Sequence, residues 1–220
     1  MGHGRSSATA KRGLKQSIRV RGFDGEVKSI AMKVPGAASG FTYDAFSKYQ
    51  TVGGDKQILD AQLKGDTAST AGKMAAAMEK YMAGKSVGGD LHRGIAVDKK
   101  TLSSLKRGKF PNRETMSSWS HHSGVAYEFA NGSAYENSFS GNGKSIPVMF
   151  TLRGGMKNAV EMDKTVSPKH LTKQGGKFVQ ASSYSEQEVL GSKVNKFRIV
   201  GYDESSYKKR GIHQFLVEQI

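Results

Sequence analysis

A chain of 220 residues is long enough for one domain with a small appendage, and its 36% hydrophobic content is sufficient for a packed core. The absence of cysteine excludes disulfides, thiolate metal sites and a cysteine nucleophile, and no apolar run reaches the roughly 18 residues of a membrane helix. The net charge of +15 favours a polyanionic partner such as nucleic acid, a ribosome or an acidic protein face, although it also serves solubility alone.

The first 87 residues are predicted to form a basic arm followed by a mainly helical part. Residues 1–20 contain no acidic residue and are expected to be flexible. No apolar segment follows them, so we expect no signal peptide and a cytoplasmic location, in the producing cell or in a target cell. A short strand or hairpin is expected within 21–34. The part from 21 to 87 is otherwise expected to be helical, with helices at 42–50, 55–65 and 69–84.

Strand-like patterns predominate after residue 87. We expect a helix at 101–108, closed by glycine, and a second helix at 123–130, capped by Ser123. Because helices come first and strands follow, the predicted class is α+β with mixed or antiparallel sheets, not a doubly wound parallel sheet. The expected strands are 90–97, 114–120, 145–152, 158–162, 177–182, 188–191, 195–203 and 211–220.

Two common functional motifs fail. The tripeptide Gly-Lys-Ser occurs twice, but Glu79 and Ser138 occupy the positions where a phosphate-binding loop needs its first glycine. His121 and His122 are adjacent, so their side chains are expected to point apart and to lack a second pair of metal ligands. We therefore expect neither a nucleotide-binding phosphate loop nor a metal site.

A set of polar residues on separate expected strands suggests a site. Side chains at i and i+2 share one face of a strand, so Glu186 and Glu188 are expected to project together, at an energetic cost unless cations or hydroxyls compensate. Ser118 and Ser120 share a face in the same way, and their hydroxyls can orient a carboxylate. Arg93 lies in an apolar strand and requires an anion, which its planar fork fits when the anion is a phosphate. An isolated Glu-x-Glu is usually a solvent-exposed pair, but this combination favours function.

The order of these motifs resembles the arginine–serine–glutamate class of arginine-specific mono-ADP-ribosyltransferases, which includes clostridial binary toxins, vertebrate enzymes and tailed-phage enzymes. The resemblance covers roughly 88–220, which would be the catalytic core, and Trp119 departs from the usual central threonine. It implies an ADP-ribosyltransferase-like fold, with a helical N-terminal part followed by two packed sheets around an NAD cleft. The three matching tripeptides are His92-Arg93-Gly94, Ser118-Trp119-Ser120 and Glu186-Gln187-Glu188.

The resemblance also implies a co-substrate and a role for each residue. NAD would be cleaved between nicotinamide and ribose, and the Glu188 carboxylate would stabilise the positive charge that grows on the ribose. Ser118 would orient Glu188, while Arg93 would bind the NAD phosphates and the backbone of Gly94 the nicotinamide amide. No metal is expected. The remaining expected NAD contacts are His92, Ser120 and Phe129.

The residues expected at the acceptor and at the nicotinamide differ in how strongly the sequence supports them. Glu186 is expected to bind and deprotonate an acceptor arginine, since a carboxylate suits a guanidinium. Tyr184 would pack against that acceptor, or is an ordinary aromatic residue of a turn. Phe129 would stack on nicotinamide, or forms a helix core face with Val125 and Ala126.

The acceptor and the biological partners stay open at this stage. Target proteins associated with ribosomes or transcription suit the basic charge, and RNA or DNA as the acceptor is an alternative. An antitoxin or immunity partner would accompany a toxin, whereas no membrane partner is expected. A non-catalytic, basic nucleic-acid-binding protein would explain the charge but not the ordered motifs.

Overall fold

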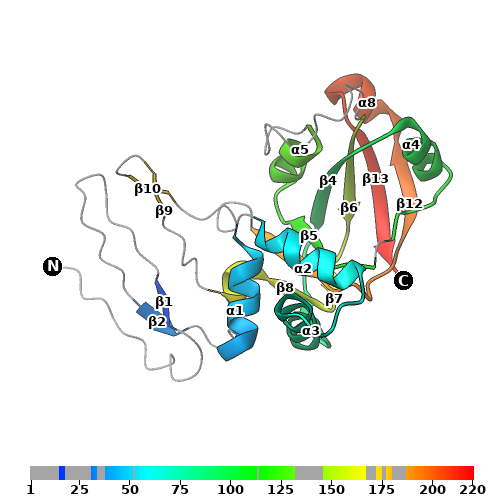
Figure 1. The fold of residues 1–220 in the computed structure, drawn as a ribbon. Coiled ribbons are helices and arrows are strands. Elements are labelled where there is room, and N and C mark those ends of the chain that lie inside the picture. The colour runs from blue at the N-terminus through cyan, green and yellow to red at the C-terminus, as the bar shows by residue number, and fades with distance from the viewer. Residues whose placement is uncertain are drawn as a thin grey trace. The chain divides into compact units, whose positions relative to one another are not determined.

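The computed structural model describes residues 38–51, 53–112, 114–131, 146–166 and 187–220, together with the backbone of four short strands. The chain divides into two compact units (Figure 1). The first consists of Met1–Tyr81 and Glu161–Ser185, and the second of Met82–Val160 and Glu186–Ile220.

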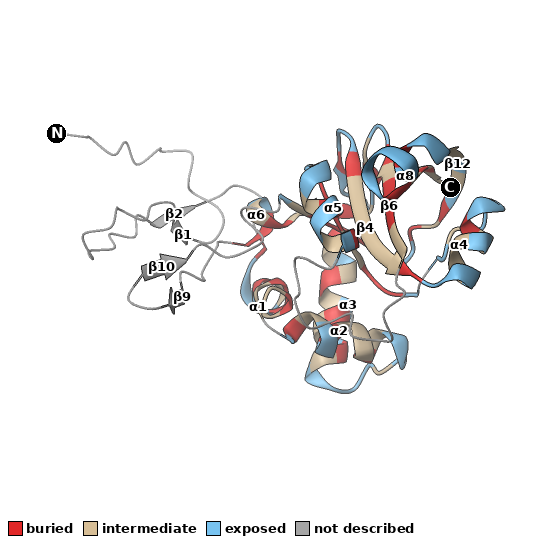
Figure 2. Ribbon diagram, turned by 90° about the horizontal axis from the view of Figure 1, so that it is seen from above, coloured by how far each residue is buried: buried red, intermediate tan, exposed pale blue. Residues whose placement is uncertain are grey.

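Helices form the described part of the first unit. Its helices are α1 (Gly40–Tyr49), α2 (Gly54–Leu63), α3 (Thr70–Met82, whose last residue belongs to the second unit) and α6 (Met162–Thr165). Phe46 of α1 is fully buried and meets the ring of Tyr81 edge to face, with centroids 5.4 Å apart. Figure 2 shows buried segments, in red, on α1 and α3. The three longer helices confirm the helices predicted from the apolar periodicity.

Short strands form two pairs elsewhere in the first unit. Strand β1 (Lys15–Ser17) pairs with β2 (Ala31–Lys33), and β9 (Thr172–Gln174) pairs with β10 (Lys177–Val179), both antiparallel. Strand β2 lies within the predicted hairpin segment, whereas β1 lies within the segment that was expected to be a flexible arm.

A seven-stranded sheet organises the second unit, in the order β12-β13-β6-β4-β5-β11-β8. Strands β13 and β6 run parallel, and the other described pairs are antiparallel, which confirms the predicted α+β class with a mixed sheet. A further two-stranded sheet joins β3 (Ser86–Val87) to β7 (Met156–Lys157). The strands of the large sheet are β4 (Leu91–Val97), β5 (Ser117–Ser120), β6 (Ile146–Leu152), β8 (Ala159–Glu161), β11 (Glu188–Gly191), β12 (Phe197–Asp203) and β13 (His213–Gln219).

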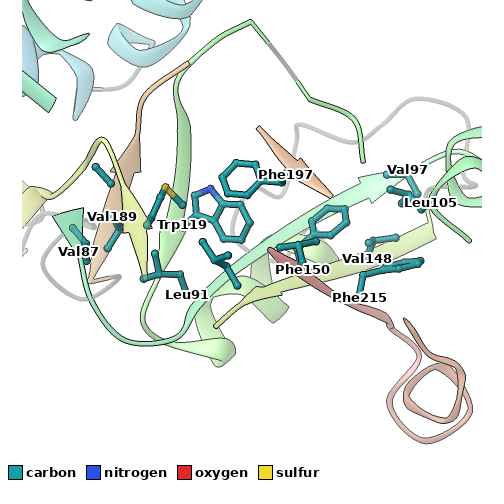
Figure 3. Close-up of a cluster of buried hydrophobic side chains, with 14 residues drawn as sticks. Val87, Leu91, Val97, Leu105, Trp119, Val148, Phe150, Val189, Phe197 and Phe215 are labelled. Atoms are coloured by element: carbon teal, nitrogen blue, oxygen red, sulfur yellow. The ribbon is translucent and has the colours of Figure 1, made fainter. Parts of the chain in front are cut away.

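One face of this sheet carries the hydrophobic core. Because strand side chains alternate between faces, Trp119 lies on the opposite face from Ser118 and Ser120. It packs against Phe197, with ring centroids 5.2 Å apart, and Phe150 and Phe215 continue the cluster along the sheet (Figure 3). The buried face leaves the other face of β4 and β5 for α5.

Three helices flank the strands of the second unit: α4 (Lys99–Lys106), α5 (Ser123–Asn131) and α8 (Glu204–Arg210). The sequence interpretation missed α8, although its signals are present: the Asp203 carboxylate accepts hydrogen bonds from two backbone amides, and Gly211 ends the helix at a φ of 72°. The predicted cap of α5 is displaced by one position. Ser123 is the first helical residue, and the carbonyl of His122 accepts the first bond, from Ala126.

Candidate functional site

Three predicted site residues form a row across neighbouring strands. Glu188 of β11 lies opposite Ser120 of β5, and Ser120 lies opposite His92 of β4. Residues directly opposite each other in a sheet project from the same face, at a spacing of about 5 Å. Ser118, two residues before Ser120 and opposite Leu190, projects from that face as well. One face of the sheet therefore carries a carboxylate, two hydroxyls and an imidazole.

Helix α5 packs directly on this face at Gly94. A β-carbon added at Gly94 would lie 1.6 Å from the carbonyl oxygen of Ala126, so only glycine allows the helix to approach the strand this closely. Ala126 and Ala130 are buried against Met149 of β6. Phe129 is half-buried, whereas Ala126 of the same helix is fully buried. The alternative that Phe129 belongs to the core face of the helix is therefore confirmed only in part.

Ser120 has a structural contact at the start of α5. Its hydroxyl oxygen accepts a hydrogen bond of 2.9 Å from the backbone amide of His122, and the residue is only 4% exposed. The serine therefore links strand β5 to the first turn of the helix. Ser118 and Glu188 are half-buried, so solvent reaches them only in part.

The surroundings of His92 favour its neutral form. Burial lowers its pKa, and His121 acts in the same direction, while Asp90 opposes the shift. Its Nδ1 lies 3.1 Å from the hydroxyl oxygen of Thr151 in β6, the residue directly opposite. The sequence predicted a strand at Thr151 but not this contact, because strand pairing is not visible in a single sequence.

The lowered pKa of His92 predicts acid sensitivity. An unfolded His92 titrates near about pH 6.5, so below that pH the unfolded state binds a proton that the folded state resists, and stability is lost as the pH falls. The pKa of His213 is also lowered, first by burial and then by Lys106, so His213 contributes to the same loss of stability in acid. We expect His92→Gln to remove part of the decrease in urea midpoint between about pH 7.5 and about pH 5.5. An unchanged pH dependence in the variant would contradict this assignment.

Arg93 projects from the face of β4 opposite to that of its motif neighbours His92 and Gly94. It lies opposite Phe150 and, with Ile95 and Trp119, lines a hollow of about 30 Å³, which is room for a water molecule or two. Strand β4 pairs with β6 along its whole length but with β5 at one position, His92 opposite Ser120. The structure thus places His92, Gly94 and both serines on the Glu188 face, and Arg93 where β4 and β5 separate.

The Glu-x-Glu segment departs from the expected extended geometry. Strand β11 begins only at Glu188, and the exposed Gln187 before it has a φ of 45°. The backbone at Gln187 is therefore left-handed and not extended as expected, while the placement of Glu186 stays a prediction. The predicted residues Glu186 and Tyr184 lie outside the described residues.

The fold resembles that of known ADP-ribosyltransferases. The ADP-ribosyltransferase Vis, a toxin of Vibrio splendidus, matches in complexes with agmatine and with the inhibitor M6, with TM-scores of 0.53 and 0.51 and identities of 15% and 16%. The matches cover 83% of this chain and 75% and 73% of the Vis chains. Exoenzyme S of Pseudomonas aeruginosa, in complex with human 14-3-3 protein beta and carba-NAD, has a TM-score of 0.49 at 15% identity, covering 82% of this chain and 76% of its own.

These likenesses establish the fold: the chain has the α+β fold of ADP-ribosyltransferases. No protein-family model and no curated protein matches the sequence. Among the residues that the structure describes, no three His, Asp or Glu side chains are grouped to hold a metal ion. Within the same ranges, no helix combines the length and apolar character required to span a membrane.

Proposed function

We propose that this protein transfers ADP-ribose from NAD to arginine side chains of target proteins and releases nicotinamide. The observation that carries the proposal is the placement of Glu188 beside two serines and a histidine on one sheet face, within this fold. These four residues, His92, Ser118, Ser120 and Glu188, belong to the sequence motifs that resemble the arginine-specific class. The enzyme would act in the cytoplasm of the producing cell or of a target cell, as a toxin or a phage-type modifier of host proteins.

Glu188 is assigned the central catalytic role. Breaking the bond between nicotinamide and ribose leaves positive charge on the sugar, and a fixed carboxylate stabilises that charge more in the transition state than in the bound substrate. Partial burial strengthens the effect, because less water screens the charge. Ser118 is assigned the orientation of this carboxylate, since it projects from the same face two pairs along the β5–β11 ladder.

The remaining predicted residues are assigned to NAD binding, and of these His92, Gly94 and Ser120 lie on the Glu188 face whereas Arg93 starts on the other face. Burial lowers the pKa of His92, which disfavours a positive charge beside a ribose that is itself becoming cationic. The backbone at Gly94 is assigned the nicotinamide amide, and the guanidinium of Arg93 the pyrophosphate. If Arg93 binds phosphate through two parallel hydrogen bonds, Arg93→Lys raises the KM for NAD more than it lowers kcat. Ser120 and Phe129 complete the proposed contacts.

An arginine acceptor follows from the Glu-x-Glu motif. Glu186 is proposed to bind the guanidinium and to accept its proton during attack, with Tyr184 packed against the acceptor. The complex of Vis with agmatine, itself a guanidinium compound, supports an acceptor of this chemistry. The net charge of +15 would bring the enzyme to ribosomal or transcription proteins, which are bound to polyanions.

Glu186→Gln separates acceptor use from NAD cleavage. We expect this variant to lose ADP-ribosylation of agmatine about a hundredfold, because the amide cannot accept the proton, while nicotinamide release to water continues. The measurement is transfer of label from adenine-labelled NAD to agmatine and to lysate proteins, with nicotinamide followed in parallel. Label on lysate material that survives protease but not nuclease would replace the arginine acceptor by RNA or DNA. Equal loss of both activities would contradict the separate role of Glu186.

A further inference from the structure

A second cavity lies away from the catalytic face, at the other end of the sheet. Its volume is about 430 Å³, and it is lined from α4, α8 and the strand ends Ile146 and His213. Ile146 pairs with Val97, five residues along β4 from His92, which is about 16 Å of strand. Figure 1 shows α4 and α8 at the same end of β12 and β13. None of the proposed catalytic residues lines this cavity.

The cavity contains a rigid group of aromatic rings. Tyr207 stacks on His213 with parallel planes, 2° apart, and centroids separated by 4.2 Å, yet Tyr207 is 47% exposed. The hydroxyl of Tyr202 lies 2.8 Å from Nδ1 of His213, and the ring of Tyr202 stacks on Phe215. Tyr207 is therefore held flat by the rings behind it while much of its own surface stays open, which suits stacking of a planar ligand.

Positive charge surrounds these rings. Lys106 places its ammonium 5.1 Å from the centre of the Tyr202 ring, and Lys99 and Lys208 also line the cavity. The carboxylates of Asp98 and Asp203 accept hydrogen bonds from backbone amides at the starts of α4 and α8. Both helices are largely exposed (Figure 2). Further exposed basic residues on or beside them are Lys100, Arg107, Lys109, Lys209 and Arg210.

A nucleotide matches this combination of groups. Its base is planar and stacks on an aromatic ring, its phosphate is anionic, and its size suits a cavity of a few hundred Å³. The Glu204 carboxylate in the lining can accept a hydrogen bond from an N–H group of a base, such as the ring N–H of uracil. The basic residues extend along both helices beyond the cavity, which is more than one phosphate requires and favours a strand over a free nucleotide.

We propose that this cavity binds one nucleotide of a single-stranded nucleic acid, with the base on Tyr207 and the neighbouring phosphates on the lysines of α4 and α8. The site would hold the protein on nucleic acid independently of its chemistry on NAD. It also gives a location to the polyanion binding that the net charge suggests.

The test is binding of a fluorescein-labelled oligouridine of about twelve nucleotides to the full chain without NAD, measured by anisotropy. We expect Tyr207→Ala to weaken binding roughly tenfold through lost stacking. The double variant Lys106→Glu/Lys208→Glu leaves the rings intact, and we expect it to weaken binding further. The slope of log binding constant against log salt concentration should become smaller in magnitude by about 1.4, because two lysines are removed. Thermal unfolding followed by circular dichroism verifies that each variant is folded.

A matched double charge reversal provides the control. Arg153 and Lys157 are exposed and lie beyond the opposite end of β6, so Arg153→Glu/Lys157→Glu should leave binding within about twofold of wild type. Equal loss in this control, or unchanged binding in Tyr207→Ala, would show diffuse electrostatic attraction and overturn the proposal. Competition by free uridine monophosphate at the same concentration as the strand would assign the cavity to a free nucleotide and overturn the single-strand assignment. Because NAD is absent, none of these results depends on the proposed transferase activity.

Discussion

Glu188→Gln is expected to lower the rate of nicotinamide release from NAD at least about a hundredfold while the protein stays folded. Glutamine has the same shape but carries no charge, so the developing cation on the ribose loses its counter-charge. The KM for NAD should change much less, because the lost interaction belongs mainly to the transition state. The measurement is steady-state nicotinamide release over a range of NAD concentrations.

A second glutamate provides the control for this substitution. Glu218 of β13, four strands from β11 in the sheet order, forms a surface ion pair with Arg198, and an exposed pair contributes little to stability. Glu218→Gln should therefore keep full activity and nearly full stability. If Glu188→Gln released nicotinamide at the wild-type rate while both variants unfolded like wild type, the assignment of Glu188 would be wrong, and with it the proposed reaction.

Gly94→Ala is expected to destabilise the fold by about 3 kcal/mol or more. The added β-carbon would lie 1.6 Å from the carbonyl oxygen of Ala126 and 2.7 Å from the amide nitrogen of Ala130. These are backbone atoms of a helix, so no rotamer change can relieve the overlap, and either α5 or β4 must shift. Urea denaturation measures the change in the free energy of unfolding.

Gly124, in the first turn of the same helix, provides the matched substitution. An added β-carbon there has no neighbouring atom within 4 Å, so Gly124→Ala should leave stability unchanged or raise it by up to about 1 kcal/mol. Similar stability for the two variants would mean that α5 does not pack on Gly94 as described. This pair of substitutions tests the fold alone and is independent of the proposed reaction.

The three longer helices of the first unit and α4 were predictable because their signals are local. Apolar spacing marks the buried side of α1, and the Asp98 carboxylate caps α4 through the amide of Thr101, three residues away. The same kind of signal is present for α8 at Asp203 and Gly211, between two expected strands. The expectation for Gln187 failed for a different reason, since a left-handed residue at the start of a strand leaves no mark on the hydrophobic pattern.

The sequence by itself determined the element types, the α+β class and the identity of the polar residues that define the candidate site. These properties depend on contacts between residues close in the chain. Only the tertiary structure decided which strands are neighbours, and so that His92, Ser120 and Glu188 form one row while Arg93 starts on the other face. The tertiary structure also requires glycine at position 94, because α5 packs against it, and it brings α4 and α8 together around the second cavity. Pairing between distant strands depends on backbone hydrogen bonds that any residue except proline can make, so one sequence carries little record of it.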